Sequence, residues 1–263
     1  MKDICIIGGG NLGTAIAQGL LMSNFCNPEN ITVTKRNIST LTDLKSKGVN
    51  IQTDNRKAVT ENEVIILAIK PFQVKEILEE IKDVLTVNHI LISVVTGISI
   101  EEIKNITGNQ IAVFRAMPNT AIAIRESITC LSSSDATETQ KNYTEELFSK
   151  LGKTVNIDEK LMNAATVLGA CGTAYAMRYI RANIQGGIEI GFDAATAGLI
   201  AAQTVKGAAE LLLTTKTHPE QEIDKVTTPK GCTIAGLNEM EHQGFSSSLI
   251  KGIKTSYEKI KKF

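Results

Sequence analysis

Features that the sequence lacks exclude several classes of function. It has no excess of charge of either sign, because 28 basic residues balance 28 acidic ones, so no surface suited to nucleic acid or to an anionic membrane is expected. No uninterrupted apolar run approaches the length that spans a bilayer. Tryptophan is absent, and the 3 histidines have no Ser, Cys or acidic partner in an arrangement typical of nucleophilic catalysis.

Cysteine usage bears on metal binding and on the cellular compartment. The 5 cysteines are odd in number and scattered, at Cys5, Cys26, Cys130, Cys171 and Cys232. They show neither the spacing of metal ligands nor that of a disulfide framework, and reduced thiols are typical of the cytoplasm. Met1 is followed almost at once by a strand-like run, which leaves no room for a signal peptide. We therefore expect a cytoplasmic protein that binds no metal.

In the first half of the chain, strand-like and helix-like patterns alternate. Short apolar runs without polar alternation, such as Ile4–Ile7, are typical of parallel strands buried on both faces. Strands are expected over 4–7, 31–34, 64–69, 90–95, 110–116, 128–131 and 154–157, and helices over 12–21, 41–47 and 72–85 and from Ser99 and Thr137. This alternation predicts an α/β fold with a doubly wound, mostly parallel sheet.

After residue 157 the strand signals stop, and 161–184, 194–213, 234–242 and 246–260 have helical spacing. The first two of these ranges are rich in Ala and Gly and are apolar on more than one face. A domain of about a hundred residues buries such helices poorly by itself. We therefore expect two domains, residues 1–157 and an all-helical 158–263, and a homodimer with intertwined C-terminal helices. Further assembly of such dimers stays open.

A glycine-rich turn closes the first expected strand. Gly8-Gly9-Gly10-Asn11-Leu12-Gly13 fits the pattern G-x-G-x-x-G between a strand and a helix. The first glycine allows a tight turn, the second lets a pyrophosphate approach the backbone, and the third lets the helix pack on the strand. The motif predicts a dinucleotide site, and a purely structural turn is the alternative.

The end of the second strand bears on which dinucleotide binds. An Asp or Glu there would hold the ribose 2′-hydroxyl of NAD, but this chain has Thr34-Lys35-Arg36-Asn37. A hydroxyl and two cations suit a 2′-phosphate, so NADPH is the expected cofactor and NADH the alternative. Surface charges without a ligand are the other interpretation.

Two further segments follow expected strands, at the edge where a doubly wound sheet opens its cleft. Ala68-Ile69-Lys70-Pro71 ends one strand, and its proline stops the strand so that the preceding carbonyls can face a nicotinamide. Met117-Pro118-Asn119-Thr120 follows another and puts the polar amide of Asn119 at the same edge, where we expect it to contact the substrate. The sequence leaves open whether Lys70 contacts the cofactor or only solvent.

The most informative segment is Val226-Thr227-Thr228-Pro229-Lys230-Gly231-Cys232-Thr233, directly before a helical run of small residues. Hydroxyls, a proline and a glycine in this order suit a loop that offers backbone N–H groups and a side-chain hydroxyl to a small carboxylate. The expected contacts with a small-molecule substrate are therefore Thr228, Gly231, Cys232 and Thr233. For Cys232, a packing role fits better than a reactive one.

Together these motifs resemble the pyrroline-5-carboxylate reductase family over essentially the whole chain. The segments that carry the resemblance are 7–13, Asn55 before the 64–69 strand, 68–71, Arg115-Ala116-Met117-Pro118-Asn119-Thr120 and 226–233. The resemblance implies an N-terminal Rossmann domain and a C-terminal helical dimerisation domain. It also implies that NAD(P)H reduces a cyclic imine to L-proline in the last step of proline biosynthesis.

Carried over by position, the resemblance also implies residue roles. The cofactor would be lined by Gly8, Gly9, Gly10, Asn11, Leu12, Gly13, Thr34, Arg36, Asn55, Ile69, Lys70, Val95, Thr96 and Gly97, next to Ala68 and Pro71. The substrate would meet Glu159, Cys232 and Thr233, the last two partly through backbone N–H groups of the partner subunit. An iminium is already electrophilic, so positioning suffices, with the Thr233 hydroxyl as the candidate catalytic hydrogen bond to the imine nitrogen.

The chain departs from the family pattern at four places. Where the family usually has Ser-Gly-Ser-Gly-Pro-Ala-Tyr, it has Gly169-Ala170-Cys171-Gly172-Thr173-Ala174-Tyr175. Arg181 stands where glutamate is common, Ala121 replaces a proline, and Lys230 replaces a glycine. Two other hypotheses therefore stay open: a catalytically impaired, nucleotide-binding regulator, and a reductase of another small imine or oxo acid.

Overall fold

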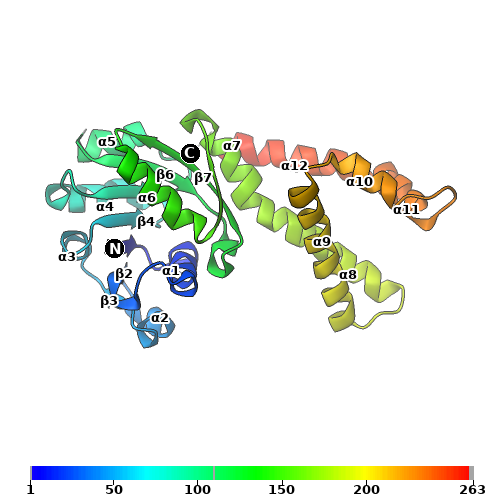
Figure 1. Ribbon diagram of the computed structural model, residues 1–263, viewed down its shortest axis with the longest axis horizontal. Coiled ribbons are helices and arrows are strands. Elements are labelled where there is room, and N and C mark those ends of the chain that lie inside the picture. Colours follow the sequence, from blue (N-terminus) through cyan, green and yellow to red (C-terminus); the bar gives the residue numbers. More distant parts are fainter. Residues whose placement is uncertain (1, 109, 261–263) are drawn as a thin grey trace. The chain divides into compact units, whose positions relative to one another are not determined.

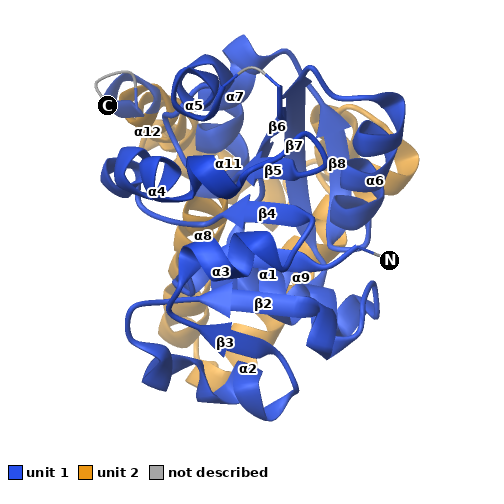
Figure 2. Ribbon diagram, turned by 90° about the vertical axis from the view of Figure 1, so that its left-hand side faces the viewer, with its two compact units in different colours: residues 1–171, 257–263 blue, residues 172–256 orange. Residues whose placement is uncertain are grey.

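The computed structural model describes residues 2–108 and 110–260, and the chain divides into two compact units. Unit 1 comprises residues 1–171 and 257–263, and unit 2 comprises residues 172–256 (Figure 2). Every strand described lies in unit 1, and unit 2 is helical. The domain boundary expected at 157/158 stays a prediction.

Unit 1 is built on one eight-stranded sheet in the order β3-β2-β1-β4-β5-β6-β7-β8 (Figure 1). The strands are β1 (Ile4–Ile7), β2 (Ile31–Thr34), β3 (Asn50–Gln52), β4 (Val64–Leu67), β5 (Ile90–Ser93), β6 (Ala112–Met117), β7 (Ser127–Ser134) and β8 (Gly152–Asn156). Among these neighbours only β6 and β7 pair antiparallel. The predicted α/β fold with a doubly wound, mostly parallel sheet is confirmed.

Helices cover both faces of this sheet, as its uninterrupted apolar strands require. Residues of α1 (Asn11–Ser23), α2 (Thr42–Ser46) and α6 (Glu138–Ser149) share one core cluster with one face of the strands. Residues of α3 (Asn55–Thr60), α4 (Val74–Ile81) and α5 (Ile100–Thr107) share a second cluster with the other face. The two layers of helices leave the carboxyl edge of the parallel strands free for a ligand.

Two helix starts expected from the sequence carry complete capping boxes. In α5 the Ser99 hydroxyl accepts from the Glu102 amide at 3.1 Å, and the Glu102 carboxylate accepts from the Ser99 amide at 2.7 Å. Hydrogen bonds from the backbone N–H and the hydroxyl of Ser99 lower the pKa of Glu102. In α6, Thr137 and Gln140 form the same arrangement. Both starts are therefore determined locally.

Several element boundaries differ from the sequence prediction. β3 and α3 went unrecognised because three and six residues are too few for a periodic pattern. β4 ends at Leu67 and β5 at Ser93, each two residues earlier than expected. The remaining apolar residues continue past the sheet edge and line the cleft described below. The expected 72–85 helix is α4 with 3₁₀ turns at Pro71–Gln73 and Lys82–Val84.

The long helix expected over 161–184 is interrupted. It consists of a 3₁₀ turn (η6, Glu159–Leu161), α7 (Met162–Ala165), a π-helical segment (Thr166–Cys171) and α8 (Gly172–Glu189). The π segment occupies part of the run in which the sequence departs from the family pattern. Because a π turn frees backbone carbonyls from the usual ladder, such segments often mark functional sites.

Unit 2 contains α8, α9 (Ala194–Thr215), α10 (Pro219–Lys225), α11 (Cys232–His242) and most of α12 (Phe245–Ile260). Of these, α10 was not expected from the sequence. The Tyr175 hydroxyl of α8 lies 2.6 Å from the Ser256 hydroxyl of α12, which ties these two helices together. Among the described residues, no helix is long and apolar enough to cross a membrane.

Candidate functional site

A cleft of about 730 Å³ lies in unit 1 over the carboxyl edge of the parallel strands. Of the residues expected to bind the cofactor, it is lined by Gly8, Gly9, Gly10, Asn11, Leu12, Thr34, Arg36, Asn55, Ala68, Ile69, Lys70, Pro71, Val95 and Thr96. Gly13 and Gly97 are not in its lining. Segments that are far apart in the sequence thus form one concave surface.

The glycine-rich turn is held by the end of β2. The amides of Gly8 and Gly9 both donate to the Thr34 carbonyl, at 3.1 and 2.8 Å. Gly8 has φ of +110°, and a Cβ there would collide with the Ala68 carbonyl. A Cβ on Gly13 would collide with the Gly8 carbonyl, so Gly13 lets α1 pack closely on the turn. Gly13 therefore acts through packing rather than by lining the cleft.

The start of α1 fits a dinucleotide pyrophosphate. The N-cap Gly10 provides no side-chain cap, and the first turn holds no acidic residue. The backbone N–H groups of the first residues of α1 therefore remain available to a ligand. They lie at the end of the helix where the helix dipole favours an anion. A Cβ at Gly10 would meet nothing within 4 Å, so a phosphate can approach the backbone there.

The polar groups at the end of β2 form a chain of hydrogen bonds. The Thr34 hydroxyl donates to Asn55 Oδ1 at 2.6 Å, and Asn55 Nδ2 donates to the carboxylate of Glu80 at 3.0 Å. The Arg36 guanidinium lies 3.2 Å from the Glu76 carboxylate, and both side chains are mostly exposed. An exposed pair of this kind is weak, so Arg36 can exchange Glu76 for a phosphate at small cost.

Lys70 lies after the end of β4, in the segment that lines the cleft. Its amide donates to Gln73 Oε1 at 3.2 Å, and its carbonyl accepts from the Gln73 amide at 2.9 Å. This tight turn contains Pro71 and follows β4, which has already ended at Leu67, two residues before the predicted end. The Lys70 side chain both lines the cleft and is exposed, so the two interpretations of its role stay open.

Asn119 is bonded within unit 1. Its Oδ1 accepts from the Ala121 amide at 3.0 Å, and its Nδ2 donates to the Gly169 carbonyl at 3.3 Å. Gly169 belongs to the π segment, so Asn119 joins the loop after β6 to that irregular turn. The neighbouring Thr120 lines the cleft, whereas Asn119 does not. The expected substrate contact of Asn119 stays a prediction.

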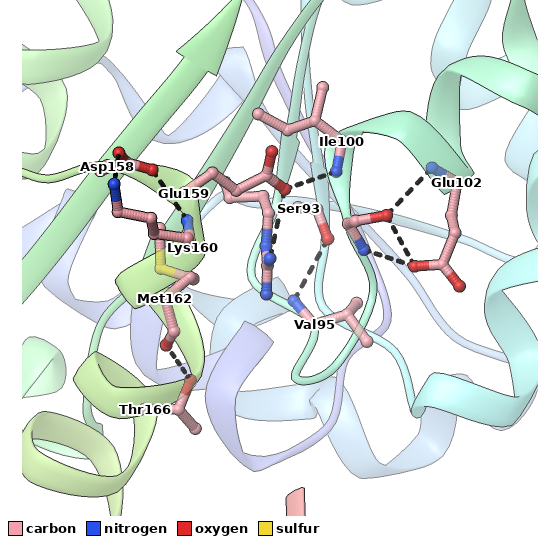
Figure 3. Close-up of polar contacts among 11 residues, drawn as sticks. Ser93, Val95, Ile100, Glu102, Asp158, Glu159, Lys160, Met162 and Thr166 are labelled. Atoms are coloured by element: carbon pink, nitrogen blue, oxygen red, sulfur yellow. Dashed lines mark hydrogen bonds and ion pairs between the residues drawn. The ribbon is translucent and has the colours of Figure 1, made fainter. Parts of the chain in front are cut away.

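Glu159 opens the 3₁₀ turn η6. One of its oxygens, Oε1, accepts from the Ile100 amide at 2.7 Å and from Arg115 Nη1 at 3.2 Å (Figure 3). The sequence motifs included Arg115 but gave it no role. The carboxylate is therefore already engaged inside unit 1, and its expected contact with substrate stays a prediction.

The 226–233 loop of unit 2 ends at the start of α11. The Gly231 amide donates to the Thr228 carbonyl at 2.9 Å, and Gly231 is the N-cap of a helix with no side-chain cap and no first-turn acid. Lys230 has φ of +59°, a left-handed conformation that explains why a glycine is usual there. Cys232 is an exposed free thiol, and Thr233 follows it in the first turn of α11.

Some cleft residues were not anticipated. They are Thr53, Gln73, Ile77, Val94 and Thr120. Thr53 follows β3, which was too short to recognise, and Ile77 lies inside the expected 72–85 helix, outside any motif. Thr120 belongs to a motif that the sequence did single out, so its position after β6 was a usable signal. The described residues contain no group of three or more His, Cys, Asp or Glu side chains suited to a metal.

Two family models match separate parts of the chain. A family model described as pyrroline-5-carboxylate reductase dimerisation matches residues 159–263, and one described as NADP oxidoreductase, coenzyme F420-dependent, matches residues 3–97. Pyrroline-5-carboxylate reductase 2 of Dictyostelium discoideum is 43% identical, over 99% of this chain and 93% of that protein. Reductase 1 of the same organism is 47% identical over 98% of this chain, which spans only 49% of that longer protein.

Solved structures agree over nearly the full length. Pyrroline carboxylate reductase of Plasmodium falciparum, with NADP bound, is 26% identical with a TM-score of 0.92 and covers 99% of this chain and 97% of that one. The enzyme of Coxiella burnetii is 30% identical with a TM-score of 0.88, covering 99% and 98%. The family suggested by the sequence motifs is thus confirmed. This chain belongs to the pyrroline-5-carboxylate reductase family.

Proposed function

We propose that this chain reduces Δ1-pyrroline-5-carboxylate to L-proline with NAD(P)H. The observation that carries the proposal is the cleft, in which a glycine-rich turn, an uncapped helix start and the 68–71 turn meet at one sheet edge. Its residues fit a dinucleotide, and the NADP-bound relative and the NADP oxidoreductase model support NAD(P)H as the cofactor. The cofactor supplies the hydride, and the protein's part is to position it against the imine carbon.

For the substrate, we propose the 226–233 loop. The unpaired amides at the start of α11 suit a carboxylate, and the Thr233 hydroxyl is the proposed hydrogen-bond partner of the ring nitrogen, accepting from the N–H of the protonated imine. Thr228 and Gly231 contribute through the turn that precedes α11, and Cys232 through the first turn of the helix. A protonated imine accepts hydride at carbon while its π electrons pass to nitrogen, so no strong acid–base pair is needed.

The preference for NADPH over NADH is a further proposal. It rests on Thr34, Lys35 and Arg36 at the end of β2, which line the cleft without a carboxylate among them. A 2′-phosphate replaces the weakly held Glu76 at Arg36 and gains a charge-assisted hydrogen bond. NADH makes no such contact.

We also propose that the active form is a homodimer with intertwined C-terminal helices, located in the cytoplasm. The dimerisation model covers residues 159–263, and large apolar side chains of unit 2 are exposed in the single chain, among them Ile190 at 78% and Leu199 at 72%. Apolar surface of this extent marks an interface rather than a solvent-facing domain.

The reaction is tested with the purified full chain and Δ1-pyrroline-5-carboxylate, by following NADPH absorbance and detecting proline. Growth of a proline auxotroph carrying the gene is the independent test. NADPH binding with neither turnover nor complementation would support a nucleotide-binding regulator instead. Faster turnover of another cyclic imine or of an oxo acid in a substrate panel would reassign the substrate.

A further inference from the structure

Arg115 is a buried cation whose one ion pair among the described residues is with Glu159. It lies in β6 directly beside Ser93 of β5, and its side chain is 5% exposed. Nη1 lies 3.2 Å from Glu159 Oε1, while Nε and Nη2 have no hydrogen-bond partner among the described residues. A buried guanidinium is strongly disfavoured unless paired, so the Glu159 carboxylate is what makes this position tolerable.

Glu159 has a second task at the start of α5. The same Oε1 atom accepts the amide of Ile100, the first residue of that helix, at 2.7 Å. Figure 3 shows the Glu159 carboxylate reaching the backbone of Ile100, with Glu102 of the same helix nearby. A carboxylate at a helix N-terminus is favoured by the helix dipole, so this bond further stabilises the start of α5 that the capping box defines.

The segment between Ser93 and Ile100 forms part of the cofactor cleft. Val94, Val95 and Thr96 line it, and the Val95 amide donates to the Ser93 hydroxyl at 3.3 Å. The segment is thus anchored by Ser93 at one end, next to Arg115, and by Ile100 at the other, on Glu159. Glu159 binds the Ile100 end directly, and its partner Arg115 is the strand neighbour of Ser93; neither residue is part of the cleft lining.

We infer that the Arg115–Glu159 ion pair is a positioning element for the cofactor, because it sets the path of the 94–96 segment against the nicotinamide dinucleotide. The inference rests on the proposed function, since it takes this cleft as the NAD(P)H site. It assigns Glu159 a role through Ile100 and Arg115, in place of direct contact with the imine substrate. Neither residue needs to touch cofactor for the pair to act.

The test measures NADPH binding directly, by cofactor fluorescence, beside kcat and KM for both substrates. Glu159→Ala removes both bonds and should weaken NADPH binding about tenfold, an effect typical of two coupled sites. Glu159→Gln keeps an acceptor for the Ile100 amide and should recover part of that loss. Lys160→Gln is the matched control: it removes an exposed pair with Asp158 in the same turn and should leave NADPH binding unchanged.

A double variant tests the charge separately. Arg115→Met combined with Glu159→Gln leaves no buried charge unpaired, so it should be more stable than Glu159→Gln alone, with cofactor binding still weakened. If Glu159→Ala does not fold, Glu159→Gln alone decides. Unchanged NADPH affinity overturns the inference, even if the melting temperature falls. If NADPH affinity is unchanged and KM for the imine rises, Glu159 contacts the substrate instead. Because binding is read without turnover, an inactive wild-type chain leaves this test valid.

Discussion

The two units of this chain bury their apolar residues very differently. Unit 1 encloses two core clusters, one on each face of its sheet, with side chains such as Ile6 and Leu67 fully buried. In unit 2, all of which the structure describes, the buried hydrophobic residues are Ala197 and Ala201. From this difference we expect unit 1 to fold around its own core and unit 2 to need apolar surface from another source.

The helices α8 and α9 show where that surface is missing. They border a hollow of about 440 Å³ lined mainly by apolar and small side chains, including Ile190, Phe192 and Ile200. Gly187 faces Ala197 so closely that a Cβ would lie 3.1 Å from the alanine methyl. Small residues thus bring these two helices together while the larger ones stay exposed, as expected for helices that pack against a second copy.

The largest effect is expected from breaking the proposed dimer. Leu199→Asp places a charge on an apolar side chain of α9 that is 72% exposed in the single chain, so unit 2 itself loses little. Burial of that aspartate in an interface should weaken dimerisation by about a hundredfold or more and reduce activity with it. Analytical ultracentrifugation alongside NADPH oxidation measures both.

Val87→Asp is the matched control in unit 1. Val87 is 56% exposed in a loop, so the same charge should change neither the oligomeric state nor activity. If Leu199→Asp stays dimeric and active, the contrast between the units is not due to dimerisation, and the exposed face of α9 needs another explanation.

Truncation of the self-contained core should act differently. Ile66 in the central strand β4 is fully buried, so Ile66→Ala should lower the free energy of unfolding by about 2–5 kcal/mol. Since the cavity lies inside one subunit, the loss should be the same at low and high protein concentration. Chemical denaturation followed by circular dichroism at two concentrations measures it. A loss that shrinks at high concentration would mean that unit 1 also depends on the partner.

Most of unit 1 could be predicted from the sequence because its signals are local. The buried strands are short apolar runs, and Ser99 and Thr137 begin helices through capping boxes that need no distant partner. The interruption of the 161–184 helix was not predictable, because the π segment is stabilised from elsewhere, in part by Asn119 at the Gly169 carbonyl. The structure of the short β3 likewise depends on pairing with β2.

The residues of the candidate site also fall into those that the sequence predicts and those that it does not. The cleft residues were found where a motif directly follows a strand, as with Gly8 and Lys70, because parallel strands end at a common edge. The bond between Glu159 and Ile100 joins residues 59 positions apart and has no sequence signature. Long-range polar contacts of this kind require the fold to be known.

A smaller effect is expected on the preference for NADPH over NADH when Arg36 is changed. Arg36→Gln removes the cation proposed to meet the 2′-phosphate and should raise KM for NADPH about tenfold, as for loss of a charge-assisted hydrogen bond, with KM for NADH unchanged. Glu76→Gln, which removes the present partner of Arg36, should shift KM for NADPH slightly downward. Equal changes for both cofactors would mean that Arg36 does not contact the phosphate.

The smallest effect concerns a strained residue in unit 2. Lys230 adopts φ of +59°, which costs a non-glycine residue about 1 kcal/mol or more. Lys230→Gly removes this strain, but glycine also gains entropy in the unfolded chain, so the free energy of unfolding should rise by less than about 1 kcal/mol.

Lys216→Gly is the matched control, since Lys216 ends α9 at φ of +57°. Both variants should raise the melting temperature slightly, whereas only Lys230→Gly should change KM for the imine, because only its loop is proposed to hold the substrate carboxylate. An equal change in KM for the imine in both variants would mean that the 226–233 loop does not hold the substrate.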